Sequence, residues 1–172
     1  MWIGFNEQQQ NFNSIFLIMG KGLRLCQNLE VNIKHIISIV KIEEGIKSGE
    51  IKEMFDKKWN NVVDQIEKYF LNNNIQQLNK TGMLSNEVIE KLENGRKARN
   101  RIIHDSIMIL SGSIHKGRIQ DKELEEYLKE IENVAKADNI VSGWIWQINE
   151  KIPPCKTEKQ YIKEINDWIN KI

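Results

Sequence analysis

The sequence has few of the residues that interrupt helices or that build disulfide and metal-bound frameworks. Its two prolines, Pro153 and Pro154, are adjacent, so the rest of the chain is free to form long helices. Its two cysteines, Cys26 and Cys155, lie far apart and outside any Cys/His cluster, which argues against a zinc site or a disulfide framework. Cys26 falls on an apolar helical face, and we expect it to pack in the core.

The chain also lacks an excess of charge and a long apolar run. Its 25 basic and 24 acidic side chains leave a net charge of +1, which predicts no general attraction to nucleic acid or to an anionic membrane. Any polyanion site must therefore be a local patch. No stretch approaches the roughly 18 apolar residues of a membrane span, and the polar N-terminus does not resemble a signal peptide. We therefore expect a cytoplasmic protein without membrane partners.

Apolar residues recur at helical spacing through most of the chain, and no alternating strand pattern of useful length is present. These features predict an all-α fold, in which residues 1–172 form a single-domain bundle of five or six helices, including long antiparallel ones. We assign the core to residues 8–137 and a C-terminal helical extension to residues 138–172. The expected helices span residues 8–46, 51–70, 85–110, 121–137 and 140–152, and a last helix follows Thr157.

Local signals predict where these helices begin and end. The polar run LNNNIQQLNKTG at 71–82 is expected to be a connection, because asparagine side chains compete for backbone hydrogen bonds. The stretch SGSIHKGR at 111–118 contains two glycines and is expected to end the third long helix, after which Asp121 caps the fourth. The TEKQ stretch that begins at Thr157 is typical of a capping box, which Gln160 completes.

The stretch RKARNRIIHD, residues 96–105, contains three of the five arginines and one of the three histidines. Asn100 and His104 are four residues apart, so their side chains project from one helix face, which Lys97 and Met108 flank. Arg99 lies about 140° around the helix from His104. Its side chain is long enough to reach toward an anion shared with them.

A solvated helix surface is the competing interpretation of this stretch. Alternating charges are typical of such a surface. Two pairs at the i,i+4 spacing, Glu93 with Lys97 and Arg101 with Asp105, would each contribute only about 0.2–0.5 kcal/mol. Composition alone leaves both interpretations open.

The order of residues adds a more specific signal. Arg99 and Asn100, followed after three residues by His104, resemble the RNxxxH signature of HEPN domains. These are α-helical domains of nucleic-acid defence and toxin systems. The stretch MGKGLRLCQNLEVNIKHII at 19–37 also resembles the first long helix of small helical proteins with such a motif. The resemblance covers residues 12–110.

The resemblance implies a metal-independent endoribonuclease without a cofactor. Active members of the family are usually dimers, in which the two motif helices face each other across a cleft. By position, His104 would be the acid or base acting on the ribose 2′-hydroxyl or the leaving oxygen, as suits a group that titrates near neutral pH. Arg99 would bind the scissile phosphate, and Asn100 would orient the histidine or the phosphate.

Other residues extend or limit this hypothesis. Arg96, Lys97 and Arg101 are candidate RNA- or phosphate-binding residues, with a solvated role as the alternative. Toxin members often carry a tyrosine two residues after the histidine, which an antitoxin adenylylates, but Ser106 occupies that position here. A toxin or phage-defence effector with an antitoxin or defence-system partner is one possibility. The alternatives are a non-catalytic module that binds a nucleotide or a partner, and a helical dimer with a purely interacting role.

The remaining histidines and the tryptophans favour structural interpretations. His35 is expected near the edge of the apolar stripe of the first helix, and His115 in a solvated loop. Neither has metal-ligand spacing to another histidine, so no metal site is predicted. We expect core positions for Trp59 and Trp168. Trp144 and Trp146 are two apart, so we expect one of them to be buried and the other to face a partner or the last helix.

Overall fold

The computed structural model describes residues 9–52, 57–68, 70–82 and 84–171, and every regular element in these ranges is helical. The predicted all-α fold class is confirmed, with six helices of at least ten residues and one short helix. In the described ranges, no helix is both long and apolar enough to cross a membrane. The helices are α1 (Gln9–Lys47), α2 (Lys57–Lys68), α3 (Leu71–Lys80), α4 (Asn86–Ile109), α5 (Ser111–Lys116), α6 (Asp121–Glu150) and α7 (Glu158–Asn170).

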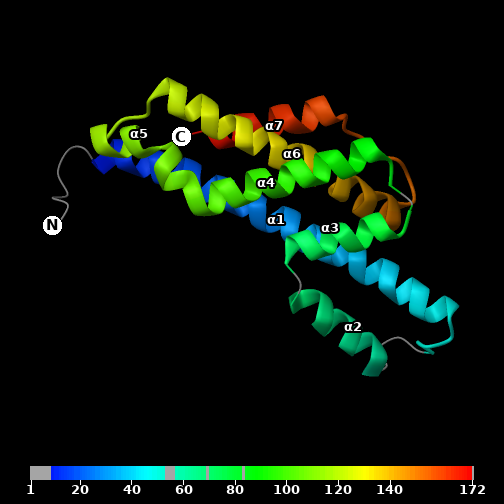
Figure 1. Ribbon diagram of the computed structural model, residues 1–172. Coiled ribbons are helices and arrows are strands. Elements are labelled where there is room, and N and C mark those ends of the chain that lie inside the picture. Colours follow the sequence, from blue (N-terminus) through cyan, green and yellow to red (C-terminus); the bar gives the residue numbers. More distant parts are fainter. Residues whose placement is uncertain (1–8, 53–56, 69, 83, 172) are drawn as a thin grey trace.

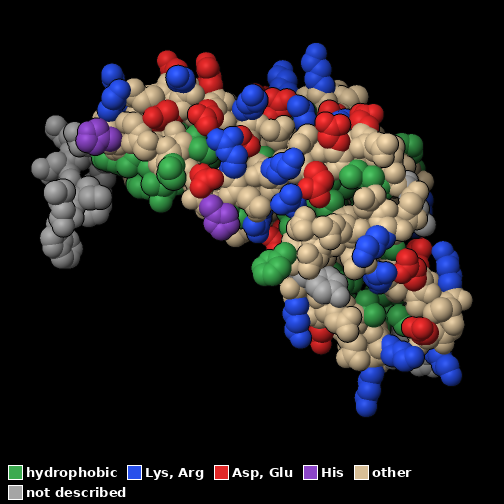
Figure 2. Space-filling view, in the orientation of Figure 1, with side chains coloured by type: hydrophobic (Ala, Val, Ile, Leu, Met, Phe, Trp, Pro, Cys, Tyr) green, Lys and Arg blue, Asp and Glu red, His purple; other side chains and the backbone are tan. Residues whose placement is uncertain are grey.

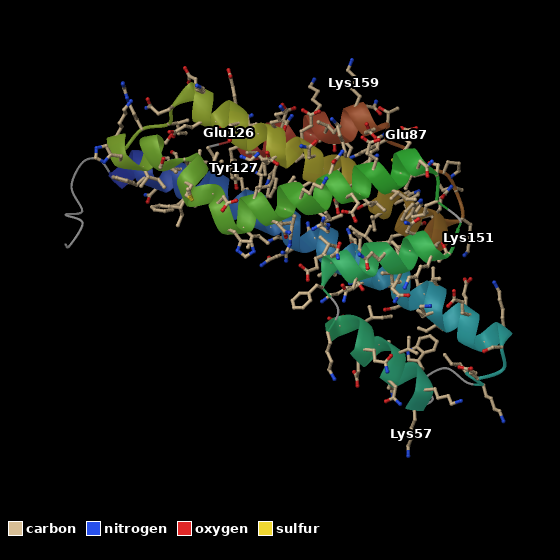
Figure 3. The ribbon with its side chains drawn as sticks, viewed as in Figure 1. Lys57, Glu87, Glu126, Tyr127, Lys151 and Lys159 are labelled. Carbon is tan, nitrogen blue, oxygen red and sulfur yellow. The ribbon has the colours of Figure 1, made fainter. Side chains whose placement is uncertain are left out.

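Three long helices, α1, α4 and α6, run side by side along the bundle, and α1 and α4 are antiparallel (Figure 1). The main core lies between them, and α7 packs on α6 and α1. Tyr127 on α6, labelled in Figure 3, is fully buried, and its hydroxyl donates to the carbonyl oxygen of Met19 on α1 at 3.4 Å. This bond supplies the partner that a buried phenol requires.

Helix α1 confirms the long first helix and most of its apolar stripe. Met19 and Cys26, seven residues apart, both face the core. Phe16 follows the same helical spacing of apolar residues, but 55% of its surface is exposed. The reason is that the buried face near the start of α1 is centred on Ile15 and Ile18, which are each 1% exposed.

The segment 71–82 was predicted to be a connection, and this prediction is wrong because most of it forms α3. Leu71, Ile75 and Leu78 follow one another at spacings of four and three residues, so they share one helix face. Each is at most 4% exposed. Burial of this apolar face outweighs the tendency of the asparagines to bond their own backbone.

The second predicted helix, 51–70, is shorter in the structure, where α2 covers Lys57–Lys68. Residues 53–56 and 69, which the prediction included, lie outside the described residues. Helix α2 packs chiefly on α1 and projects from the end of the bundle (Figure 1). Ile66 is its buried residue.

The segment 111–118 was expected to be a loop, but Ser111–Lys116 forms the short helix α5. The carboxylate of Glu123, on α6, accepts hydrogen bonds from the backbone N–H groups of Gly112 and Ser113 at 2.9 and 2.7 Å. These N–H groups belong to the first turn, which has no partner inside the helix. The Glu123 carboxylate, which follows α5 in the sequence, thus stabilises the first turn of this helix.

The predicted break between the fourth and fifth helices is also wrong. Helix α6 is continuous from Asp121 to Glu150 and passes through the junction between residues 137 and 138. Its N-cap is Gln120, and Asp121 is its first helical residue rather than its cap. Asp138 does not interrupt the helix, because its side chain bonds to other side chains, on α1, α6 and α7, instead of to its own backbone.

Two predicted helix starts are confirmed. The Ser85 side chain accepts a hydrogen bond from the Val88 backbone N–H at 3.3 Å and caps α4. Thr157 and Gln160 form the reciprocal capping box at the start of α7. Each cap satisfies backbone donors that the first helical turn leaves unpaired.

Helices α4 and α6 approach each other closely at Gly95. A Cβ atom at this position would lie 2.3 Å from the Cβ of Ala137 and 3.3 Å from the carbonyl oxygen of Asn133. The first distance is below any ordinary contact, so a larger residue would force the two helices apart. Glycine is therefore required here by close packing and not by backbone conformation.

We expect Gly95→Ala to lower the free energy of unfolding by about 1–3 kcal/mol, which is typical of overpacking. Gly20→Ala in α1 is the matched control, because a Cβ there meets no atom within 4 Å. Helix propensity alone predicts that the free energy of unfolding of this control rises by up to about 1 kcal/mol. Urea unfolding followed by circular dichroism measures both values, and equal stabilisation of the two variants would contradict the close approach.

Candidate functional site

The arginine-histidine stretch, residues 96–105, lies in the second half of α4. Ala98 and Ile102 face the core and are at most 1% exposed, which orients the rest of the helix. Asn100 and His104 lie on the opposite side, where Asn100 is half-buried and His104 is exposed. The two side chains therefore share an outward face of α4.

Arg99 points to the side of α4 that faces α1. Its Nη2 donates to Oε2 of Glu30 on α1 at 2.5 Å, and its Nη1 donates to Oδ1 of Asn100 at 3.1 Å. Its Nε is buried and has no hydrogen-bond partner among the described residues. The guanidinium thus joins a carboxylate on one helix to the amide of the neighbouring motif residue.

Glu30 is the residue of this site that the motif did not reveal. Its carboxylate lies between Arg99 and Lys34, whose Nζ is 3.7 Å from Oε1. The sequence does carry a signal for it, because Glu30 interrupts an apolar row of the first helix. Which cation it meets depends on how α1 and α4 pack, which the sequence pattern does not indicate.

Cys26 lies one turn from Glu30 on α1 and is fully buried, as predicted. Burial raises the pKa of its thiol to about 12, and the nearby Arg99 guanidinium offsets part of that rise. The thiol is therefore neutral at physiological pH. Its role beside Arg99 is packing rather than nucleophilic chemistry.

The other two arginines of the stretch are also matched by carboxylates. Arg96 pairs with Glu93 at 2.9 Å, and Arg101 reaches from α4 to Glu126 at 2.9 Å and to Glu130 on α6. The predicted pairs of Glu93 with Lys97 and of Arg101 with Asp105 are replaced by these contacts. The replacement arises because Arg101 faces α6, where two carboxylates lie within reach.

A hollow of about 580 Å³ lies between α4 and α6, next to the face that bears His104. Arg101 and Lys122 contribute positive charge to its lining, while Asp105, Glu123 and Glu126 contribute negative charge. Glu126 is labelled on α6 in Figure 3. Acidic groups outnumber basic ones there, so this hollow does not attract a phosphate by charge.

The candidate residues for phosphate contact share one face of α4. Arg96, Lys97, Asn100, Arg101 and His104 fall within an arc of about 140° on α4. Only Arg101 among them lines the hollow between α4 and α6. Figure 2 shows acidic and basic side chains intermixed over this side of the bundle rather than a uniform basic surface.

The remaining histidines lie away from the motif. His35 is exposed at the rim of an apolar hollow of about 400 Å³ between α1 and α2, which Trp59 also lines. His115 is exposed on α5 and not in a loop. Within the described ranges, no group of three or more His, Cys, Asp or Glu side chains could hold a metal ion.

The tryptophans divide between the core and its rim. Trp168 and Trp144 are half-buried and pack against the main core. Trp59 is half-buried against α1, outside that core, so the predicted core position is only partly correct. Trp146 is 40% exposed and lines a cavity with Tyr161 of the last helix.

Comparisons of the chain with protein-family models, curated proteins and solved structures find no match in any of the three.

We expect Glu30→Gln to lower the free energy of unfolding by about 1–2 kcal/mol, because it leaves a partly buried guanidinium without its counter-charge. Both side chains of the pair are only about a quarter exposed, at 22% and 25%. Glu43→Gln is the matched control, since its pair with Lys47 is exposed and is expected to contribute under about 0.5 kcal/mol. Chemical unfolding measures both values, and equal effects would show that the Arg99 contact adds nothing.

Proposed function

We propose that the chain is a HEPN-like, metal-independent endoribonuclease that acts as a homodimer. The observation that carries this proposal is the order of Arg99, Asn100 and His104 late in a long helix of an all-α bundle, with His104 exposed. An exposed imidazole on a rigid helix can reach a substrate while its backbone stays in place. RNA is the substrate class that the resemblance implies.

In this proposal His104 transfers the proton. It takes the proton of the ribose 2′-hydroxyl, whose oxygen then attacks the adjacent phosphorus, or it gives a proton to the leaving 5′-oxygen. Proton transfer by a positioned side chain contributes typically 10²–10⁴-fold to the rate. A second copy of His104, from the partner subunit, supplies the complementary acid or base.

Arg99 and Asn100 act as a unit. Because Arg99 holds Oδ1 of Asn100, the amide N–H groups of Asn100 are left to donate toward a phosphate on the His104 side. Arg99 itself can bind the scissile phosphate only in competition with Glu30, which already neutralises it. The main role of Arg99 in this proposal is therefore to position Asn100.

The surface around His104 supports the dimer. Ile107 and Met108, in the last turns of α4, are 65% and 74% exposed, and Phe16 and Leu17 of α1 are 55% and 45% exposed. Figure 2 shows hydrophobic side chains gathered on the surface at the α5 end of the bundle. Clustered apolar surface of this kind is typical of an interaction site. A two-fold contact along α4 would cover it and bring two His104 side chains to one cleft.

A non-catalytic nucleotide- or partner-binding module of the same fold is the second candidate. The pairing of Arg96, Arg99 and Arg101 with carboxylates favours it, because these pairs leave little free positive charge near His104. Under this candidate the same face binds its ligand without cleaving it.

We expect His104→Ala to reduce cleavage of structured RNA and tRNA by about 10²–10⁴-fold, since it removes the proton-transfer group. His115→Ala is the matched control, because it removes another exposed histidine from α5. The measurement is the initial rate of cleavage by the purified protein, freed of any bound inhibitor. Equal rates for the wild type and His104→Ala, or no cleavage with retained RNA binding, would support the non-catalytic module instead.

We expect Met108→Glu to dissociate the dimer, because it places a charge on the exposed apolar surface of α4 near His104. Ile46→Glu is the matched control, since Ile46 is 55% exposed at the far end of α1. Light scattering coupled to size exclusion gives the mass of each variant. A monomeric wild type, or a dimer that Met108→Glu leaves intact, would contradict the proposed interface.

A further inference from the structure

A buried carboxylate outside the His104 site lacks a cationic partner. Asp138 on α6 is 2% exposed. Its carboxylate accepts hydrogen bonds from Tyr161 on α7, from Asn32 on α1 at 3.1 Å and from Ser142 at 3.4 Å. All three donors are neutral, and no ion pair to Asp138 is formed within the described part of the chain. Burial without a counter-charge raises the pKa of this carboxyl.

Two of the residues that bond Asp138 also line a cavity. Ser142 and Tyr161 line a hollow of about 220 Å³ between the second half of α6, the segment 151–157 and the start of α7. This volume is below the roughly 300–1,000 Å³ of drug-sized ligand sites. A ligand of only a few heavy atoms therefore fits.

The cavity has aromatic and apolar walls. Trp146 and Tyr161 contribute rings, and Pro154 faces α6, where a Cβ on Gly143 would come within 3.3 Å of the proline ring. A side chain at Gly143 would narrow the cavity, so glycine keeps it open. Aromatic rings that line a cavity can recognise an organic cation through cation–π contact.

Two opposite charges belong to the cavity and its surroundings: Lys156 lines it, and Asp138 lies behind Ser142 and Tyr161. The Nζ of Lys156 is bonded to Oε2 of Glu164 at 2.5 Å. The positive charge of Lys156 is thus matched by Glu164, and the charge of Asp138 remains unmatched. An uncompensated buried charge is costly, and a ligand of opposite charge removes part of that cost.

We propose that this cavity binds a small organic monocation with a compact alkylammonium head. The head lies against the rings of Trp146 and Tyr161, and Asp138, behind the side chains of Ser142 and Tyr161, is its counter-charge. The site is independent of the proposed RNA chemistry, because none of its residues belongs to the arginine-histidine stretch.

The test titrates the full chain with choline chloride and, separately, with 3,3-dimethylbutan-1-ol, which has the same shape without the charge. Calorimetry and the amide NMR signal of Gly143 report binding. We expect saturable binding of choline and at least about tenfold weaker binding of the neutral alcohol. Equal binding of the two compounds, or no saturable binding of choline, overturns the proposal without the use of any variant.

Two variants test the assigned roles. Asp138→Asn keeps the shape and removes the charge, so choline is expected to bind at least about tenfold more weakly. Trp146→Leu removes one ring and is expected to weaken choline binding about threefold to tenfold. Asp167→Asn, an exposed carboxylate on α7 outside the cavity lining, is the matched control and is expected to bind as the wild type does. Circular dichroism verifies that each variant is folded, and unchanged binding by Asp138→Asn overturns the assignment of Asp138.

Discussion

The contact between α4 and α6 at Gly95 determines how every other face of α4 is used. Gly95 is a position of α4 that lies close against α6, and Ala98 and Ile102 are buried in the core. Arg99 then faces α1, and His104 faces outward. The arginine and the histidine of the motif are thus on different sides of one helix, and Asn100 bonds Arg99 while it shares the outward face with His104.

Much of the fold could be predicted from local patterns. The caps at Ser85 and Thr157 involve groups within three residues of one another, so the sequence contains all the information they need. Helix α3 and the continuity of α6 through Asp138 could not be predicted in the same way. Both depend on burial against distant segments, which outweighs the preference of Asn and Asp for bonding to their own backbone.

The sequence predicts which residues belong to the candidate site but not which side chains they contact. The motif identifies Arg99, Asn100 and His104, but the partner of Arg99 is 69 residues away, on α1. A count of arginines predicts a basic patch, whereas each of the three meets a carboxylate: Arg96 meets one on its own helix, and Arg99 and Arg101 meet carboxylates on the helices that pack against α4. Asp138 is the opposite case. The sequence as a whole has balanced charges, but the fold buries this carboxylate beside neutral hydrogen-bond donors and without a cationic partner.

The position of α2 divides the bundle into parts of unequal stability. This helix packs chiefly on α1, so its opening removes contacts such as that of Ile66 without disturbing the junction of α4 and α6. Local opening of this kind has a lower free energy than global unfolding. Amide protons in α2 are therefore expected to exchange with solvent faster than those at the junction of α4 and α6.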